Sequence, residues 1–583
     1  MNNDEKNGCY EENGKFICNP EKFDIYLFET PEKFNDIFPY ISKCDEVHLS
    51  DCDFSSLQEL KFKDGAEIYL DYCQGFPKNL NFSNCDEINL TLCDLSSLQE
   101  LKFKNGAKVN LSSCKNLPSN LDFSKCDEVN LSGCDLSSLQ ELKFKDGAEV
   151  YLSESKNLPS NLDFSKCDEV NLSGCDLSSL QELKFKDGAE VYLSESKNLP
   201  SNLDFSKCDE VNLSGCDLSS LQGLKFKDGA KVNLSESKNL PSNLDFSKCD
   251  EVNLSGCDLS SLQELNFKDG AKVNLSKCKN LPSNLDFSKC DEVNLSKNPY
   301  LPSDLDFSKC NEVNLSGCDF LFTSNINKFK DGAKVNLSNC ENLPNNLDFS
   351  KCDEVILTNC DLSSLQELKF KDGAEVDLSQ CKNLPNNFDI SKCDKINLAH
   401  CDLSSMQELK FKDGAEIKFG ANAKLPENLN VSNCGKIITS PELIDEYKIY
   451  IGNAKVTPVG FPRGTLDLSN IKNIVSSESP MEFLSLKSVE EVVLRDKEQY
   501  NDLLEKGIIN ENLNISYKNN EYSKEKMKEI MTTDSNNAHK KIDAMEANAT
   551  KIGKPLDKHQ QYTQNNSPKV VASAIARLTD RGR

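Results

Sequence analysis

Cysteine is the residue type with the widest chemistry in this sequence, which has 583 residues and 27 cysteines. Thiols can pair as disulfides, hold metal ions or act as nucleophiles. All of them except Cys9 and Cys18 fall at two positions of a recurring pattern, either three residues before a Val or Ile or five residues after it. Ser155, Ser196 and Ser237 take the second position in some repeats. We therefore expect the cysteines to be small buried residues that remain free thiols in a reducing compartment.

Other patterns that could support catalysis are weak. His400 stands beside Cys401 as in a base and nucleophile pair, but Cys401 occupies a buried thiol position, and adjacent strand residues face opposite sides. The sequence has four histidines and contains no C-x-x-C pair, phosphate-binding loop or H-E-x-x-H motif. Neighbouring acidic residues do not indicate a catalytic pair, because the repeat places them in every unit. We therefore expect a protein that is not an enzyme and needs no cofactor or metal.

A repeat of 41 residues positions the cysteines, as the interval between Cys126 and Cys167 illustrates, and each repeat divides into two units of about 20 residues. In each unit two apolar residues, such as Val129 and Leu131, alternate with polar neighbours, as a half-buried strand requires. A fixed period of this length indicates a solenoid, whose units bury their apolar faces against their neighbours. About twenty units between residues 44 and 440 predict one long parallel sheet. A right-handed β-helix of another kind is the structural alternative.

Two kinds of return segment link the expected strands. In one, Leu139, Leu142 and Phe144 are spaced like one or two loose helical turns, and Lys-Asp-Gly follows as a turn. In the other, Pro159 within NLPSNLDF argues against a full helix and favours an extended or short 3₁₀ segment. The expected fold class is an α/β-type solenoid. Its long parallel β-sheet would line the concave face, with short helical, 3₁₀ or extended returns on the convex face.

The pattern resembles the leucine-rich repeat family, whose signature is L-x-x-L-x-L-x-x-N/C-x-L. Repeats of 20 to 21 residues with an L-P-x-x-L return resemble its short bacterial class, which is found in secreted effectors of pathogens. Some of those effectors end in a ubiquitin-ligase domain with a catalytic cysteine, and the absence of any cysteine after Cys434 excludes that activity here. The residues that carry the resemblance are Cys126, Val129, Leu131, Cys134 and Leu136, with Gly147 and Ser155 as departures in the alternate unit.

The segments that flank the repeats differ from them in composition. Residues 1–43 contain KFDIYLF and PEKFNDIF, a strand and a helix that would cap the first repeat. Residues 441–516 carry degenerate repeats and the helical stretch EQYNDLLEKG, and would form a C-terminal cap. Residues 517–583 hold 13 Lys or Arg against 8 Asp or Glu and few large apolar side chains, which predicts a mostly disordered basic tail. This tail could be a secretion signal, a docking peptide or a solvated tail.

The overall charge narrows the range of partners. A net charge of −26 argues against nucleic acid and anionic membrane surfaces, and it fits a basic protein partner or simple solubility. No stretch reaches the 18 or so apolar residues of a membrane helix. The start, MNNDEKNGCYEENGK, lacks the apolar core of a signal peptide. We therefore expect a monomer that is made in the cytoplasm and leaves the cell, if at all, without a signal peptide.

The strand residues that point away from the core form the natural binding surface. The position before the buried Val or Ile is mostly Glu or Lys, and the position after it is mostly Asn with occasional Tyr. Asp127 and Asp168 belong to a further acidic row in alternate units. An acidic sheet with tyrosines suits a basic protein, although the same residues could serve solubility alone. The candidate partner-binding residues are Glu128, Asn130, Glu149, Tyr151, Glu169, Asn171, Glu190 and Tyr192.

Several central repeats are nearly identical, which favours either avidity along a repetitive ligand or specificity at irregular places. These irregular places include His48 and Tyr69 near the start and the segments 297–308 and 320–329.

Together these features predict a non-enzymatic protein that binds a basic protein through its sheet face. Two biological settings compete for this activity. The short repeat class and the basic tail suggest a bacterial effector delivered into host cells. Acidity, many cysteines and alternating repeats of two lengths resemble the ribonuclease inhibitor family, which suggests an intracellular inhibitor or scaffold, although that family has longer repeats. A surface adhesin is a third reading, disfavoured by the missing signal peptide.

Overall fold

The computed structural model describes residues 9–19, 40–458, 464–474 and 489–517, with gaps of one to five residues inside the last three ranges. The chain forms two compact units. The first, here called the solenoid unit, comprises residues 1–436 and 449–452. The second comprises residues 437–448 and 453–583. Each unit is described by itself.

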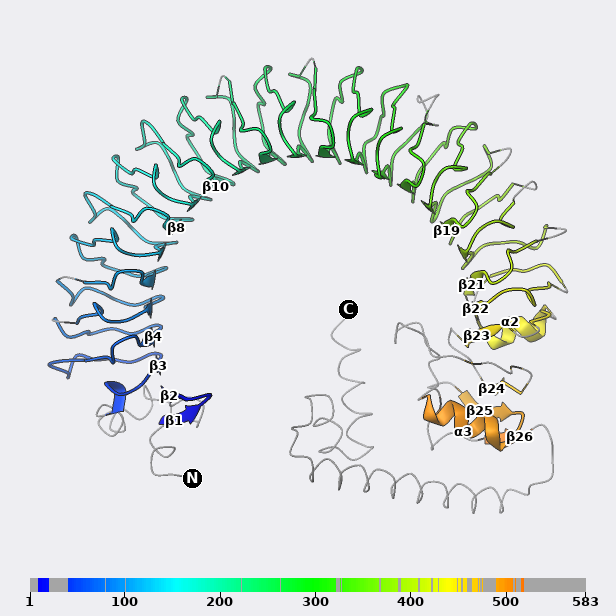
Figure 1. Cartoon of the computed structure of the whole chain (residues 1–583), viewed down its shortest axis with the longest axis horizontal. Coiled ribbons are helices and arrows are strands. Elements are labelled where there is room, and N and C mark those ends of the chain that lie inside the picture. The colour runs from blue at the N-terminus through cyan, green and yellow to red at the C-terminus, as the bar shows by residue number, and fades with distance from the viewer. Residues whose placement is uncertain are drawn as a thin grey trace. The chain divides into compact units, whose positions relative to one another are not determined.

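The solenoid unit is a stack of coils, each of which contributes one short strand to a parallel sheet, so the predicted solenoid is confirmed. The strands line the inside of the curve of this unit, and the turns and returns lie outside them (Figure 1). The first ten strands of the stack are β3 (Glu46–His48), β4 (Glu67–Tyr69), β5 (Glu87–Asn89), β6 (Lys108–Asn110), β7 (Glu128–Asn130), β8 (Glu149–Tyr151), β9 (Glu169–Asn171), β10 (Glu190–Tyr192), β11 (Glu210–Asn212) and β12 (Lys231–Asn233).

Neighbouring strands pair in register, so each position of one coil lies beside the same position of the next. Val129 faces Val150, and Asn130 faces Tyr151. The central Val or Ile is buried in every strand, whereas the residues on either side are partly or fully exposed. The later strands are β13 (Glu251–Asn253), β14 (Lys272–Asn274), β15 (Glu292–Asn294), β16 (Glu312–Asn314), β17 (Lys334–Asn336), β18 (Glu354–Ile356), β19 (Glu375–Asp377), β20 (Lys395–Asn397), β21 (Glu416–Gly420) and β22 (Lys436–Thr439).

The return segments between β3 and β22 contain no helix in the part of the chain that is described, so the α/β class and the helical returns are not supported. The Leu139 N–H donates to the Leu136 carbonyl at 2.9 Å, which closes a single turn. Phe144 then pairs with Phe123 of the neighbouring coil in an isolated parallel bridge. A coil of about 20 residues must cross the core and come back. Extended chain covers about 3.3 Å per residue against 1.5 Å in a helix, which favours returns of turns and non-helical chain in so short a coil.

The core of the solenoid unit consists of side-chain columns that run from coil to coil. Val129, Leu131 and Phe123 are fully buried, and their counterparts in other repeats repeat this pattern. Phenylalanine rings of consecutive returns stack, with 5.4 Å between the ring centroids of Phe103 and Phe123. Such contacts join only adjacent coils, which is the property that defines a solenoid.

All 27 cysteines are buried and none forms a disulfide, as the sequence predicts, but the two cysteine positions have different roles. The second position forms a ladder of hydrogen bonds between coils. The Cys134 thiol donates to the Leu111 carbonyl at 3.1 Å, and the Ser155 hydroxyl donates to the Leu131 carbonyl at 2.8 Å. Asn298 continues the ladder with an amide bond of 2.9 Å to the Leu275 carbonyl. Cys, Ser and Asn exchange at this position because each is a small hydrogen-bond donor.

A hairpin precedes the first coil. Its strands β1 (Cys9–Glu12) and β2 (Lys15–Cys18) pair antiparallel around Asn13 and Gly14, which have φ values of 52° and 79°. Asn-Gly is typical of the tight turn that needs two such residues. Strand β2 also pairs in parallel with β3, so the two strands of the hairpin extend the sheet at this end. The segments KFDIYLF and PEKFNDIF of the predicted cap lie outside the described residues.

The second unit contains a small parallel sheet of β24 (Gly464–Asp467), β25 (Val489–Leu494) and β26 (Ile515–Tyr517). The predicted helix in EQYNDLLEKG is confirmed as α3 (Lys497–Glu505), which begins where Asp496 accepts the Gln499 N–H. The domain boundaries remain predictions, and residues 518–583 of the basic tail lie outside the described part. The other elements of this region are α2 (Pro441–Glu446) and β23 (Lys455–Pro458).

The donor ladder makes a prediction at Ser155. Ser155→Ala removes the hydroxyl that binds the Leu131 carbonyl, and we expect a loss of about 0.5–1.5 kcal/mol in the free energy of unfolding. Ser155→Cys restores a donor that most repeats carry at this position and should stay close to the parent protein. Denaturant unfolding of the three proteins measures both effects. Equal stability of the alanine variant and the parent would show that the ladder contributes nothing.

Candidate interaction surface

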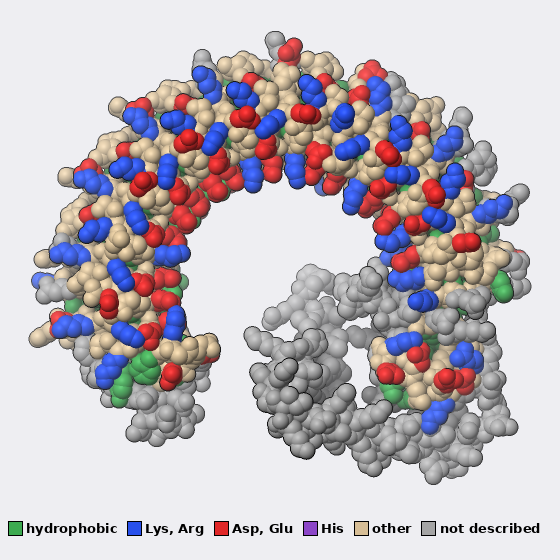
Figure 2. Space-filling model, viewed as in Figure 1, with side chains coloured by type: hydrophobic (Ala, Val, Ile, Leu, Met, Phe, Trp, Pro, Cys, Tyr) green, Lys and Arg blue, Asp and Glu red, His purple; other side chains and the backbone are tan. Residues whose placement is uncertain are grey.

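The inner face consists of the residues just before and just after the buried Val or Ile of each strand. Their side chains project from the sheet on the side away from the core, and acidic groups gather along the inner edge of the solenoid unit (Figure 2). On β11–β16 these residues line a shallow hollow of about 620 Å³. All eight sequence-predicted binding residues belong to the inner face, on the consecutive strands β7–β10.

Glutamates of five consecutive strands, β7 to β11, lie side by side on the inner face. We call them the glutamate row. Because the strands are in register, each carboxylate lies about 4.8 Å along the sheet from the next. Within the described residues no lysine forms an ion pair with any member except Glu128, which pairs with Lys108 at 3.1 Å. The row comprises Glu128, Glu149, Glu169, Glu190 and Glu210.

Lysines relieve this repulsion at the same position elsewhere on the sheet. The Lys272 ammonium pairs with Glu292 of the next strand at 2.8 Å. Lys395 pairs with Glu375 of the preceding strand at 2.6 Å. Such partly exposed pairs contribute little individually, but they neutralise neighbouring charges. The glutamate row therefore has less lysine compensation than these parts of the face, because among the described residues only Glu128 of its five members has a lysine partner.

At Glu169, burial and the neighbouring carboxylates both disfavour the charged form. The pKa of the Glu169 carboxyl is raised, first by burial and then by the charges of Glu149, Glu190 and Glu128, although a hydrogen bond from Tyr151 opposes the shift. A raised pKa means that the ionised form is disfavoured in the folded protein. A cationic ligand would remove this cost.

Two tyrosines stand among the glutamates. The Tyr151 hydroxyl lies 3.1 Å from a Glu169 oxygen and 3.2 Å from a Glu149 oxygen, and the Tyr192 hydroxyl donates to Glu190 at 2.9 Å. Burial and the neighbouring glutamates raise the pKa of both phenols, so both stay protonated donors. The tyrosines orient the carboxylates and offer aromatic surface between them.

The asparagines of the predicted site have a structural task. The Asn130 side-chain oxygen accepts the Ser132 N–H at 2.9 Å, and Asn171 does the same for Ser173 at 3.0 Å. This local bond closes the turn that follows the strand. The prevalence of Asn in this column thus reflects turn formation, and the N-x-S spacing is the signal that could have indicated it.

The acidic row of Asp127 and its counterparts is ion-paired. Lys145 pairs with Asp127. Lys186 bridges Asp168 at 2.6 Å and Asp146 at 3.2 Å. In most Lys-Asp-Gly turns the lysine thus pairs with an aspartate 18 residues earlier, a spacing that was available in the sequence, whereas Lys330 contacts Asn311. These aspartates add less free negative charge to the surface than the sequence suggests.

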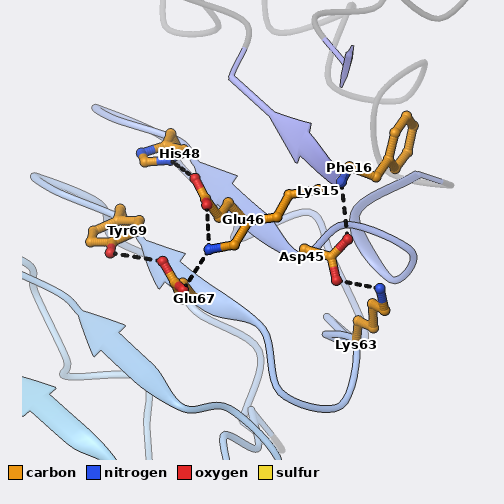
Figure 3. A network of polar contacts seen from close by, with 8 residues as sticks. All are labelled: Lys15, Phe16, Asp45, Glu46, His48, Lys63, Glu67 and Tyr69. Atoms are coloured by element: carbon orange, nitrogen blue, oxygen red, sulfur yellow. Dashed lines mark hydrogen bonds and ion pairs between the residues drawn. The ribbon is translucent and has the colours of Figure 1, made fainter. Parts of the chain in front are cut away.

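The irregular residues at the start of the solenoid belong to the contact between the hairpin and the first coils (Figure 3). The rings of His48 and Tyr69 stack with 4.6 Å between their centroids. Lys15 of the hairpin reaches Glu46 at 2.7 Å and Glu67 at 2.8 Å. The lysine therefore caps the inner face where its first two glutamates meet.

Cys401 is buried, and its thiol donates to the Leu378 carbonyl at 3.0 Å. Burial raises the pKa of this thiol to about 11. His400 lies in the turn after the strand, with a φ of 62°. The thiol is thus engaged in the donor ladder.

Among the described helices, none has the length and apolar character that crossing a membrane requires.

Replacing one row member tests the repulsion. Glu169→Gln keeps an acceptor for Tyr151 and removes a charge whose pKa is raised. The ionised carboxyl costs stability above its raised pKa, and this cost disappears as the pH falls below the ordinary value of about 4.3. We therefore expect the free energy of unfolding at pH 7 to exceed that of the parent by up to about 0.5 kcal/mol, and to equal it near pH 3. Denaturant unfolding of both proteins at the two pH values measures this difference.

The matched control is Glu292→Gln, which breaks the ion pair with Lys272 and should not raise the midpoint at pH 7. An equal decrease for both variants would contradict the repulsion.

Comparisons with known proteins add no family assignment, because no family model and no curated protein matches this chain.

Proposed function

We propose that the solenoid unit is an interaction module that binds a basic protein through the glutamate row. The observation that carries the proposal is the contrast within one sheet. Lysines pair with glutamates along much of the inner face, but Glu149, Glu169 and Glu190 have glutamates on both sides and no lysine partner among the described residues.

Folding does not require glutamate at this position. Lys108, Lys272 and Lys334 occupy it in other coils whose strands pair in the same register. A row of five glutamates therefore carries an electrostatic cost that the fold could have avoided. A ligand with Lys or Arg at matching intervals would offset that cost and gain charge-assisted hydrogen bonds. Tyr151 and Tyr192 would pack on the aliphatic parts of such side chains, since tyrosine offers rigid amphipathic contact area.

The ladder supports the resemblance to leucine-rich repeats. The signature position for Asn or Cys is occupied here by Cys134, Ser155 or Asn298, and in each case the side chain donates to a carbonyl of the preceding coil. We infer that the chain is a short-repeat member of that class. For the biological setting, the short repeat class favours a bacterial effector. An intracellular inhibitor or scaffold is the alternative, and it shares the acidic, cysteine-rich composition.

A charge-reversal experiment tests the binding face. The full chain carrying Glu149→Lys, Glu169→Lys and Glu190→Lys is compared with the parent as bait for affinity capture, and bound proteins are identified by mass spectrometry. We expect a basic protein to bind the parent and to bind this variant at least about tenfold more weakly, a loss of 1.4 kcal/mol or more. Binding to the parent should also weaken as salt is raised.

The control variant carries Glu154→Lys, Glu195→Lys and Glu236→Lys. It changes the net charge equally, and these exposed turn positions hold lysine in other coils, as Lys277 and Lys297 show. The proposal requires that this variant binds like the parent. Equal retention by all three baits would refute the glutamate row as the binding site, and equal loss from both variants would mean that only net charge matters.

A further inference from the structure

Three cysteines from separate segments meet beside the first coil. Cys9 begins β1, Cys18 ends β2, and Cys44 precedes β3 by two residues. Their sulfur atoms all lie within 4.8 Å of one another, and none of the three side chains is exposed. The pairing of the strands explains the meeting. Cys9 lies opposite Cys18 across the hairpin, and Cys18 lies beside Val47 of β3.

This cluster differs from the other cysteines of the chain. In the described residues, no other three His, Cys, Asp or Glu side chains bring ligand atoms so close together. The ladder cysteines each donate to a backbone carbonyl, as Cys134 does to Leu111, and Cys44 makes a similar bond to the Tyr40 carbonyl at 3.2 Å. The other repeat position recurs mostly in alternate coils, about 10 Å apart, and Cys290 and Cys310 in neighbouring coils bring only two thiols together. Here three thiols converge on one point.

We propose that Cys9, Cys18 and Cys44 bind one thiophilic d¹⁰ metal ion, Zn²⁺ or Cu⁺, which fastens the hairpin to the first coil. A metal–sulfur bond of about 2.3 Å places three ligating sulfur atoms about 3.8–4.0 Å apart, so the observed spacing needs little adjustment. Thiolates are the protein ligands that such ions prefer. On binding, three S–H groups release their protons to solvent and three metal–sulfur bonds form, and Zn²⁺ would also keep one water molecule as its fourth ligand.

The site would act as a clip at the end of the stack. A solenoid has no neighbour for its terminal coil and needs a cap there. The hairpin contributes the strands β1 and β2 and the ion pairs of Lys15 with Glu46 and Glu67. A metal bound only by the folded arrangement stabilises that arrangement, because its binding free energy becomes folding free energy. This inference does not depend on the proposed binding face.

The test uses the full chain, purified under reducing anaerobic conditions and stripped of metal with a chelator. Zn²⁺ and Cu⁺ are titrated in separate arms against competing chelators, and bound metal is measured per chain. We expect one ion per chain in at least one arm and a higher unfolding midpoint when it is bound. The arm with the tighter binding identifies the metal.

Single variants locate the ion. Cys9→Ser, Cys18→Ser and Cys44→Ser should each lose stoichiometric binding. Cys126→Ser is the matched control, because Cys126 occupies the position of Cys44 in a later coil and is equally buried. X-ray absorption on the parent protein gives a readout that needs no variant, and it should show three sulfur neighbours at about 2.3 Å.

Three outcomes would overturn the site: no ion bound against the chelators, equal loss of metal in Cys126→Ser, or sulfur coordination absent from the absorption spectrum. A Cys9–Cys18 disulfide in the reduced preparation, found by peptide mass mapping, would also overturn it. The directly opposed pair could form such a bond in place of the metal site.

Discussion

In-register stacking of consecutive coils provides the buried contacts on which the solenoid unit depends. Each Val of the sheet, such as Val129, lies between the same residue of the coil before and the coil after. In the phenylalanine column and the donor ladder, too, side chains at equivalent positions of adjacent coils lie next to one another. Stability in such an arrangement is a sum of coil and nearest-neighbour terms. A small change at a column position is therefore felt by two neighbours.

The same register that builds the core also sets the electrostatics of the surface. Identical coils place identical charges about 4.8 Å apart, which is unfavourable unless the chain varies them. It does so with Lys-Glu pairs on the inner face and with lysines that bridge aspartates at the turns, as Lys186 does. In the glutamate row only Glu128 has a lysine partner within the described residues. Its cost and its accessibility together make it the strongest candidate for recognition.

The beginning of the stack presents a different problem, because the first coil has no preceding neighbour. The hairpin covers the first coil with a charged side chain and two thiols in addition to apolar packing. Lys15 neutralises the first two glutamates of the inner face, and Cys9 and Cys18 bring their thiols to Cys44. Residues that are irregular in the repeat pattern, such as His48 and Tyr69, gather at this junction. Irregularity here marks the end of a periodic structure.

Periodicity in the sequence by itself determined the solenoid, its strand positions, the burial of Val129 and its counterparts, and the free thiols. Spacing along one coil is a local property, and a repeated spacing has few structural solutions. Only the tertiary structure decided what the exposed positions do. The meeting of Cys9, Cys18 and Cys44 depends on which atoms of separate segments come within bonding distance. For Asn130 and Asp127 the spacing is present in the sequence, but only the structure shows the bonds to Ser132 and Lys145. The structure also replaced the helical return expected at Leu139 with turns and non-helical chain, which suits a coil of about 20 residues because a helix covers less distance per residue.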